Sequence, residues 1–383
     1  EIYMGDWSSD VCSSDLLMRQ DVTIERFEAI RGGTSAILST NGPASIINFI
    51  TRRGGEEPEG IIKATVASYN SMRGDFFYGG PLSEDWRVGF GGYYRNGDGV
   101  RDIGMTADHG GQVRFNLTRD FDGGYLSFGL KHIDDHNTFY LPIPLTNVKN
   151  PKGVPGVDPN YGTLDGPDVS NITFQTSQGP KVTDLSEGFA TKATAFGVDF
   201  MHELGGSWTV RSNGRLTNYK VSPNSVFNGP NSWLVTAANR IDPQNEDIAD
   251  LLTTFASQGA VRAGLVYVDS GQLIANPAAL NGNGFVTDSV AETRHRDVEH
   301  FVEQLSFSHE TDRNSFSAGM LYVAQTLKRD IDYGGRIVTE LRDRPRRLDI
   351  VALDANNDVV GYLTDNGPIW RSEERRVGKE CRS

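Results

Sequence analysis

The stretch His132-Ile133-Asp134-Asp135-His136 concentrates the residue types that bind metals or transfer protons. Two histidines lie four positions apart with two carboxylates between them. On a β-strand both histidines would point to the same side. A metal site needs three or four converging ligands with supporting hydrogen bonds, and only two converge here. We therefore interpret the stretch as a polar cluster that lines a lumen, and we predict no metal site.

Aromatic residues between the regular segments are a second set of candidates. Such side chains offer a large contact area at a small entropy cost, so they could stack on a sugar ring or an aromatic chelator. They could equally pack the loops internally. The most concentrated stretch is Phe139-Tyr140-Leu141-Pro142-Ile143-Pro144. The candidate ligand-binding residues are Asp134, Asp135, His136, Phe139, Tyr140, Tyr161 and Trp233.

Other patterns that carry chemistry are absent or incomplete. Asp354-Ala355-Asn356-Asn357-Asp358 resembles the start of a calcium loop, but Val359 stands where that loop needs glycine, and the terminal glutamate is missing. We predict a turn there. No G-x-S-x-G elbow or other nucleophile context occurs. We expect no catalytic residues, no cofactor and no enzymatic activity.

Length and composition limit the possible classes. The chain has 383 residues, and 37 Lys+Arg against 50 Asp+Glu give a net charge of -13. This composition excludes collagen, coiled coils and disulfide scaffolds. The acidic balance argues against a DNA or RNA partner, because nucleic-acid binders carry basic patches. No apolar run approaches the ~18 residues that a transmembrane helix needs, but a membrane β-barrel remains possible.

The two ends look foreign to the protein. Residues 1–16 and 371–383 resemble in-frame translations of the adapters used in short-read DNA sequencing, and we exclude both from the fold. Cys12 and Cys381 lie in these segments, so residues 17–370 contain no cysteine and no disulfide or thiolate site. We expect the remaining chain to be an internal fragment of a longer protein.

From Gly60 onward, apolar residues recur at every second position, which is the period of a β-strand. In Trp86 to Gly91, for example, apolar residues alternate with arginine and glycine. One face of each strand is therefore apolar, and the other is polar or glycine. The pattern predicts nine strands, near residues 60–70, 72–80, 85–96, 109–120, 123–137, 188–204, 206–222, 294–310 and 314–330.

The connections between these strands alternate between short and long. We expect long loops at about 138–187, 223–293 and 331–370, all at the same end of the strands. An antiparallel meander with tight turns at one rim and large loops at the other is typical of outer-membrane barrels. A soluble β-sandwich would show similar alternation, but two long structureless connections weigh against it. Within the longest connection, residues 246–255 have the spacing and acidic first turn of a short helix.

A different pattern lies between Asp21 and Gly55. Val22 to Gly33 predicts a strand that ends in a glycine turn, Thr34 to Leu38 predicts one helical turn, and Ile46 to Arg53 predicts a second strand after a glycine-proline bend. The residue types in this pattern do not by themselves indicate a function.

In order and spacing, however, the segment resembles the end of the plug domain of TonB-dependent outer-membrane receptors. Ile24 to Gly32 matches the family's I-E-R-I-E-V-[IL]-R-G-P stretch, and Ile46 to Arg53 matches G-G-V-I-N-[IV]-I-T-[KR]. This chain departs from the family pattern at three places. Gly33 replaces the usual proline, Ser39-Thr40-Asn41 replaces the tyrosine-glycine turn, and Ala44-Ser45 replaces the double glycine before the second strand.

The resemblance implies an all-β fragment of a plugged, antiparallel transmembrane barrel of about 22 strands. Residues 17–57 would be the C-terminal part of an α+β plug, and residues 58–370 the first part of the barrel. In the family, the arginine before the plug glycine helps to hold the plug among barrel carboxylates. The residues implied in this locking are Arg31, Gly32 and Gly33, with Glu25 and Glu28 as neighbours. Arg52 and Arg53, at the plug exit, could be solvated or functional.

By resemblance, the function is TonB-dependent import of a scarce nutrient across the bacterial outer membrane. The ligand would be a ferric siderophore, an oligosaccharide or a similar small molecule, and the partners would be the TonB complex and outer-membrane lipid. The alternatives are a passive porin-like barrel, which the plug-like segment contradicts, and a secreted β-rich binding module, which would be soluble without detergent.

Overall fold

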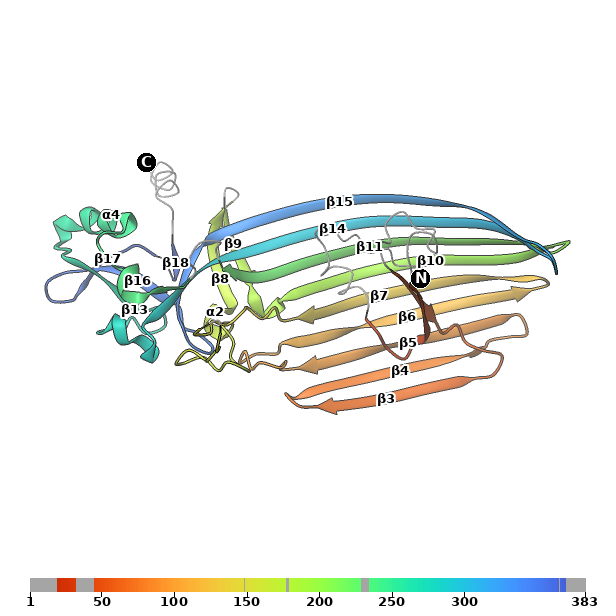
Figure 1. The fold of residues 1–383 in the computed structure, drawn as a ribbon, viewed down its shortest axis with the longest axis horizontal. Helices are drawn as coiled ribbons and strands as arrows, with labels where there is room; N and C mark the ends of the chain where they lie inside the picture. Colours follow the sequence, from red (N-terminus) through yellow and green to blue (C-terminus); the bar gives the residue numbers. More distant parts are fainter. Residues whose placement is uncertain are drawn as a thin grey trace.

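The computed structural model describes residues 19–31, 45–147, 149–176, 179–228, 234–364 and 366–369. One large antiparallel sheet dominates the molecule (Figure 1). Its main strands are β3 (Glu59–Ala67), β4 (Ser71–Pro81), β5 (Trp86–Gly97), β6 (Asp108–Phe121), β7 (Gly124–Asn137), β10 (Phe189–Gly205), β11 (Trp208–Asn228), β14 (Phe285–Glu310) and β15 (Ser315–Glu340).

These nine strands confirm the nine predicted from the sequence, and neighbours in the chain pair in the sheet from β3 to β15. The short connections are tight turns. Between β10 and β11, Gly205, Gly206 and Ser207 all have positive φ, at 83°, 57° and 64°. Glycine tolerates that region without steric cost, which lets the two strands reverse within a few residues.

The two faces of the sheet differ as the alternation predicts. One face, which we call the outer face, carries a continuous band of exposed apolar side chains. Cross-strand register places Phe301, Leu216 and Phe196 side by side in this band. Near the short turns, Trp208 stacks on His309 and meets the edge of Phe316. Further members include Ile62, Phe90, Phe115, Leu130, Met320 and Tyr322. An apolar band with an aromatic edge suits contact with lipid.

The opposite face, which we call the inner face, is polar or glycine and is covered by residues 19–31 and 45–57, here called the inner segment (Figure 1). Two strands form its core, β1 (Ile24–Arg31) and β2 (Ser45–Thr51), paired antiparallel from Ile24 opposite Thr51 to Arg31 opposite Ser45. Both strands were predicted from the sequence. The predicted helical turn at residues 34–38 lies outside the described residues.

At the end with the long connections, a second folded region continues from β14 and β15 (Figure 1). Its elements are α2 (Pro167–Ser170), β8 (Asn171–Thr176), β9 (Gly179–Asp184), η1 (Leu185–Glu187), β12 (Leu234–Thr236), α3 (Ala237–Arg240), α4 (Glu246–Thr254), η2 (Ala256–Gln258), β13 (Arg262–Tyr267), η3 (Pro277–Gly282), β16 (Leu348–Leu353), β17 (Val359–Tyr362) and β18 (Pro368–Ile369). We call residues 138–187, 234–284 and 341–369 the loop cap.

The expectation that two of the long connections are structureless is therefore wrong. The strands β13, β16 and β17 form a small sheet of their own, in which Arg262 lies opposite Leu353. Two hydrophobic clusters fill the cap, one around Leu265 and Ile350 and one around Ile172 and Phe174. The strands β11, β14 and β15 also extend further than predicted. The sequence period misses these parts because residues buried on both sides do not alternate.

The helix α4 confirms the helix predicted at residues 246–255. The Asn245 side chain accepts a hydrogen bond from the backbone N–H of Asp247, which caps the first turn. Ile248 and Leu251 are fully buried in the first cap cluster. The turn predicted at residues 354–358 is also present, where the Asp354 carboxylate accepts hydrogen bonds from two backbone N–H groups.

We expect Leu251→Ala to destabilise the cap by about 2–5 kcal/mol, because it opens a cavity in a closed cluster. Hydrogen exchange of the amides in β13 and β16 should rise while that of β3 to β7 is unchanged. The matched control is Thr254→Ala, which alters an exposed residue of the same helix and should leave both unchanged. Equal protection in both variants would show that Leu251 does not hold the cap together.

Candidate functional site

The contact between the inner segment and the sheet is rich in hydrogen bonds and ion pairs. The Gln112 amide on β6 donates to the Asp21 carboxylate (2.6 Å) and to the carbonyl oxygen of Arg19 (2.9 Å). Arg73 on β4 donates to the carbonyl oxygen of Gln20 (2.6 Å). Each of these wall residues lies on the inner face, so the strand alternation itself directs the polar groups to the inner segment.

Asp135 is the centre of this interface. Its carboxylate is fully buried and accepts two hydrogen bonds from the Arg95 guanidinium at 2.9 Å. Arg19 of the inner segment contacts the same carboxylate at 2.8 Å. Two guanidinium groups from different parts of the chain thus share one buried acid, which joins the inner segment to the wall. Such a desolvated, charge-assisted pair is strong while all its members are present.

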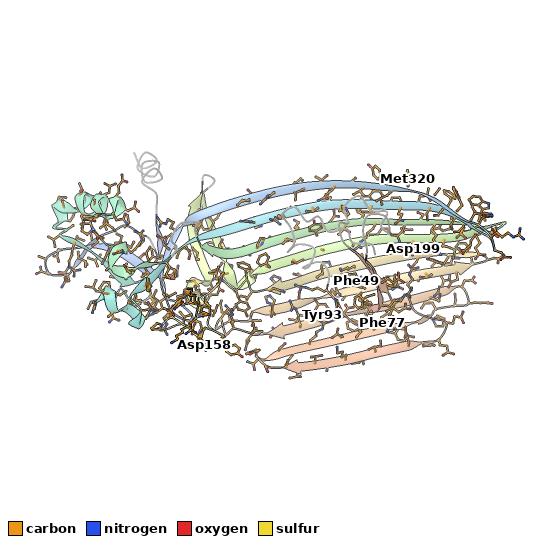
Figure 2. All side chains as sticks on the ribbon, in the orientation of Figure 1. Phe49, Phe77, Tyr93, Asp158, Asp199 and Met320 are labelled. Atoms are coloured by element: carbon orange, nitrogen blue, oxygen red, sulfur yellow. The ribbon has the colours of Figure 1, made fainter. Side chains whose placement is uncertain are left out.

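The exit of the inner segment makes a second set of contacts. Arg52 contacts Glu59 (3.5 Å), and its carbonyl oxygen accepts a hydrogen bond from Asn116 (2.8 Å). Arg53 forms an ion pair with Asp199 on β10 and lies over the ring of Tyr125. Figure 2 shows Asp199, Phe77 and Tyr93 in the middle of the sheet, in the region over which the inner segment runs. Both arginines are therefore engaged with the wall.

At this exit, the backbone of the inner segment also lies close to the backbone of the wall. Gly54 has φ of +80°, and a Cβ atom there would lie 2.2 Å from the carbonyl oxygen of Val88 and 2.9 Å from the nitrogen of Gly80. At Gly79, a Cβ atom would lie 2.8 Å from the Cα of Gly54. Glycines on both partners are what allows the inner segment to lie directly against the wall.

The structure describes only some of the residues that were predicted to lock the plug. Arg31 ends β1, and nothing is described of its side chain, whereas Gly32 and Gly33 lie outside the described residues. Glu25 and Glu28 both contact Arg26, at 3.1 and 3.0 Å, on an exposed part of β1. The lock at Arg31 stays a prediction, and the contacts that the structure shows are those of Arg19, Arg52 and Arg53.

The histidine stretch lies on β7 and is split between the two faces. Because side chains alternate, Asp135 points to the inner face, whereas His132, Asp134 and His136 point to the outer face. The prediction that the histidines line the lumen is therefore wrong. His136 contacts Asp134 (3.1 Å) and Glu187 (3.0 Å) and stacks on His109 at 4.4 Å. Among the described residues, no group of three or more potential ligands is arranged to hold a metal ion.

The aromatic candidates occupy several environments. Phe139 packs on Phe189 and against the second cap cluster. The Tyr140 hydroxyl donates to the carbonyl oxygen of Arg101 (3.2 Å), and burial raises the pKa of that hydroxyl. Tyr161 is 59% exposed and lies 6.5 Å from Tyr69. Trp233 lies outside the described residues. Of the aromatic candidates that are described, Tyr161 is the most accessible to a ligand.

Two acidic residues, Glu340 and Asp343, tie the three parts of the cap together. Glu340, at the end of β15, is fully buried and accepts hydrogen bonds from Asn281 (3.0 Å), Tyr267 (3.3 Å) and Arg346 (2.9 Å). Arg346 also lies over the Tyr267 ring, 3.6 Å from its centroid. Asp343 accepts a hydrogen bond from the backbone N–H of Asp158, the cap residue labelled in Figure 2 (3.0 Å). The long connections therefore form one braced unit.

A second buried acid makes the cap sensitive to pH. Burial raises the pKa of Asp165 from 3.8 to about 6, although hydrogen bonds from Thr163 and from the backbone of Leu141 oppose this shift. The folded state thus binds a proton more tightly than the unfolded state does. Asp165 is neutral in both states below pH 3.8, and ionising it in the folded cap costs stability as the pH rises from about 4 to 6.

We expect Asp165→Asn to remove this dependence, because asparagine keeps the shape without the charge. The variant should gain up to about 3 kcal/mol at pH 7 relative to the natural residue, and nothing at pH 3.5. Hydrogen exchange of cap amides at the two pH values measures the difference. The exposed Asp168, changed to asparagine, is the control. A gain that is the same at both pH values would contradict the assignment.

Sequence reasoning missed most of the interface. Asp199, Gln112 and Asn116 appear in the sequence as ordinary polar positions of alternating strands. Their positions in the two-residue alternation could have identified them. All three fall on the polar side of their strands, and that side must meet the plug-like segment. No helix in the described ranges is both long enough and apolar enough to cross a membrane.

Comparisons with known proteins give two informative similarities, and no family model matches. The ferrioxamine receptor of Yersinia enterocolitica is 22% identical over 222 residues, which cover 58% of this chain and 28% of that receptor. The ferric preacinetobactin receptor BauA of Acinetobacter baumannii superposes with a TM-score of 0.53 at 11% identity, over 88% of this chain and 45% of BauA. The chain thus spans less than half the length of either protein, and the superposition shows a shared fold.

Proposed function

We propose that this chain belongs to the family of TonB-dependent receptors of the bacterial outer membrane, and that it forms the plug end and first barrel strands of a ferric siderophore importer. In this proposal, residues 17–57 are the C-terminal part of the plug, and residues 58–370 are the first part of the barrel. The loops at about 138–187, 223–293 and 331–370 face the outside of the cell.

The observation that carries the proposal is the asymmetry of the sheet. Its outer face is an apolar band, and its inner face binds the inner segment through Asp135, Gln112 and Asp199. A wall that is apolar outside and holds a polar, charge-paired body inside suits a plugged barrel in a membrane. A passive pore does not require a segment that fills its interior. A secreted, soluble module does not require an exposed apolar band.

The ligand class is part of the proposal, and its support is that the similar proteins are named as receptors for ferrioxamine and ferric preacinetobactin. These relatives favour a ferric siderophore over an oligosaccharide. The ligand would meet the loop cap and the apex of the plug, and Tyr161 is the exposed aromatic residue best placed to contact it. The other candidates, Asp134, Asp135, His136, Phe139, Tyr140 and Trp233, stay predictions, and three of them are placed unfavourably: Asp135 is buried between Arg19 and Arg95, and Asp134 and His136 point to the outer face. The TonB complex would then pull on the plug.

Uptake by the complete receptor tests the proposal. The full gene is expressed in a bacterial strain that lacks its own siderophore receptors, and uptake of radioactive iron is measured with several ferric siderophores. We expect saturable uptake of at least one siderophore, abolished when TonB is deleted. Uptake that persists without TonB would indicate a passive pore, and the absence of uptake for every siderophore would remove the proposed ligand class.

A further inference from the structure

The carboxyl end of β7 meets the loop cap on the outer face of the sheet. At Gly188, which joins η1 to β10, a Cβ atom would lie 2.1 Å from the carbonyl oxygen of Asn137. The chain therefore passes directly against the end of β7, which brings Glu187 beside His136. Leu185, at the start of η1, is buried in the second cap cluster. A contact at Glu187 thus links that cluster to the wall.

Both nitrogens of the His136 ring face oxygen atoms. Nδ1 lies 3.0 Å from a carboxylate oxygen of Glu187 and 3.3 Å from the carbonyl oxygen of the same residue. Nε2 lies 3.1 Å from a carboxylate oxygen of Asp134. A neutral imidazole donates from one nitrogen only, so its other nitrogen would turn a lone pair toward an oxygen lone pair. These contacts are all satisfied only when the ring carries two protons.

The charges on the outer face balance when the ring is doubly protonated. Asp134 also contacts Lys192 on β10 (3.0 Å), so the two carboxylates, Asp134 and Glu187, face one ammonium and one imidazolium group. When His136 loses a proton, one positive charge disappears from this group. The ring then bonds only one of the two carboxylates, and its contact with the other becomes repulsive.

The remaining ionisable neighbours lie on β5, β6 and β7. The ring of His109 stacks on that of His136, with 4.4 Å between the centroids and 13° between the planes. A second positive charge at this distance would repel the first, so the stacked pair suits one charged ring and one neutral ring. Asp108 and Asp135 point to the inner face, where both contact Arg95, at 3.9 and 2.9 Å.

We propose that His136 is a proton-controlled latch between η1 of the loop cap and the wall. With two protons, the ring bonds Glu187 of the cap and Asp134 of the wall together. Histidine is the side chain that ordinarily titrates between pH 5 and 8, whereas carboxylates ionise at about pH 4. The latch is therefore closed at pH 5.5 and weakened at pH 8.5. It needs neither a siderophore nor TonB, so its failure is distinguishable from failure of the proposed function.

Hydrogen exchange of the complete receptor in detergent at pH 5.5 and pH 8.5 tests the latch. The readout is the protection factor of the η1 amides, which corrects for the pH dependence of the exchange chemistry itself. We expect this factor to fall about fivefold at pH 8.5 in the natural protein, the effect of ion pairs whose carboxylates are half-exposed. In His136→Gln, which cannot gain a charge, it should be low and equal at both pH values. Glu187→Gln should also abolish the pH dependence.

His132→Gln is the matched control, because His132 lies on the same face of β7 but contacts the hydroxyl of Thr194 (3.0 Å) and not a carboxylate. This variant should keep the full pH dependence. The heat-dependent migration of folded barrels in gels verifies that each variant is folded. Equal protection of η1 at both pH values in the natural protein would overturn the inference. A pH dependence that persists in both His136→Gln and Glu187→Gln would also overturn it.

Discussion

Replacing Asp135 by asparagine is expected to loosen the inner segment from the wall by about 3–5 kcal/mol. The side chain keeps its shape but loses the charge that Arg19 and Arg95 share. Both guanidinium groups then remain in the interface without their common partner, and burying an uncompensated charge costs more than the ion pair contributes. Hydrogen exchange of the β1 amides should accelerate, and cells that produce the complete receptor should admit large antibiotics.

The matched control for this experiment is the neighbouring residue. Asp134 precedes Asp135 on the same strand but points to the outer face, where it contacts Lys192 (3.0 Å) and His136. An exposed ion pair of this kind contributes less than about 1 kcal/mol, so Asp134→Asn should leave β1 protected. If the two variants accelerate exchange in β1 equally, Asp135 does not hold the inner segment.

Gly54→Ala is expected to have the second large effect, about 2–5 kcal/mol, on the same interface. The left-handed backbone at φ +80° is unfavourable for alanine, and the added methyl group would overlap the carbonyl oxygen of Val88. Backbone atoms cannot rotate out of the way as a flexible side chain would. The inner segment must therefore move from the wall, which would also strain the hydrogen bond from Arg87 to the Gly54 carbonyl oxygen (3.1 Å).

Gly55→Ala provides the comparison, because the nearest atom to a Cβ there is 3.7 Å away and the backbone is not left-handed. This change should be close to neutral. Chemical denaturation of the complete receptor, followed by a fluorophore attached to the inner segment, measures both variants. Similar midpoints for the two would show that the close approach at Gly54 contributes little to the position of the inner segment.

The strands of the wall could be predicted because one constraint acts on each of them. A strand with lipid on one side and polar partners on the other must alternate, and β5 and β10 do so along most of their length. It was harder to decide from the sequence which of the two alternating faces of a strand points inward. The sequence places His132 and His136 on one side of β7, but only the contact between Asp135 and Arg19 shows which side faces inward.

The loop cap could not be predicted for a different reason. The strand β16 is buried at every residue, so it shows no period of two. Its partner β13 lies far away in the chain, and nothing in either sequence specifies the register of Arg262 opposite Leu353. The short helix α4 was an exception, because its acidic first turn and the spacing of Ile248 and Leu251 are local signals.

The pairing of β13 with β16 also has a consequence for the order of folding. Each hairpin of the wall, such as β14 with β15, joins residues that are close in the chain and can form as soon as its turn closes. The cap sheet needs β16, which follows both of those strands, to meet β13, which precedes them. Contacts between distant segments form slowly, since loop-closure entropy must be lost first. The residues of the cap should therefore remain open to proteases after the wall hairpins have become resistant, and should be the last of the described parts to mature.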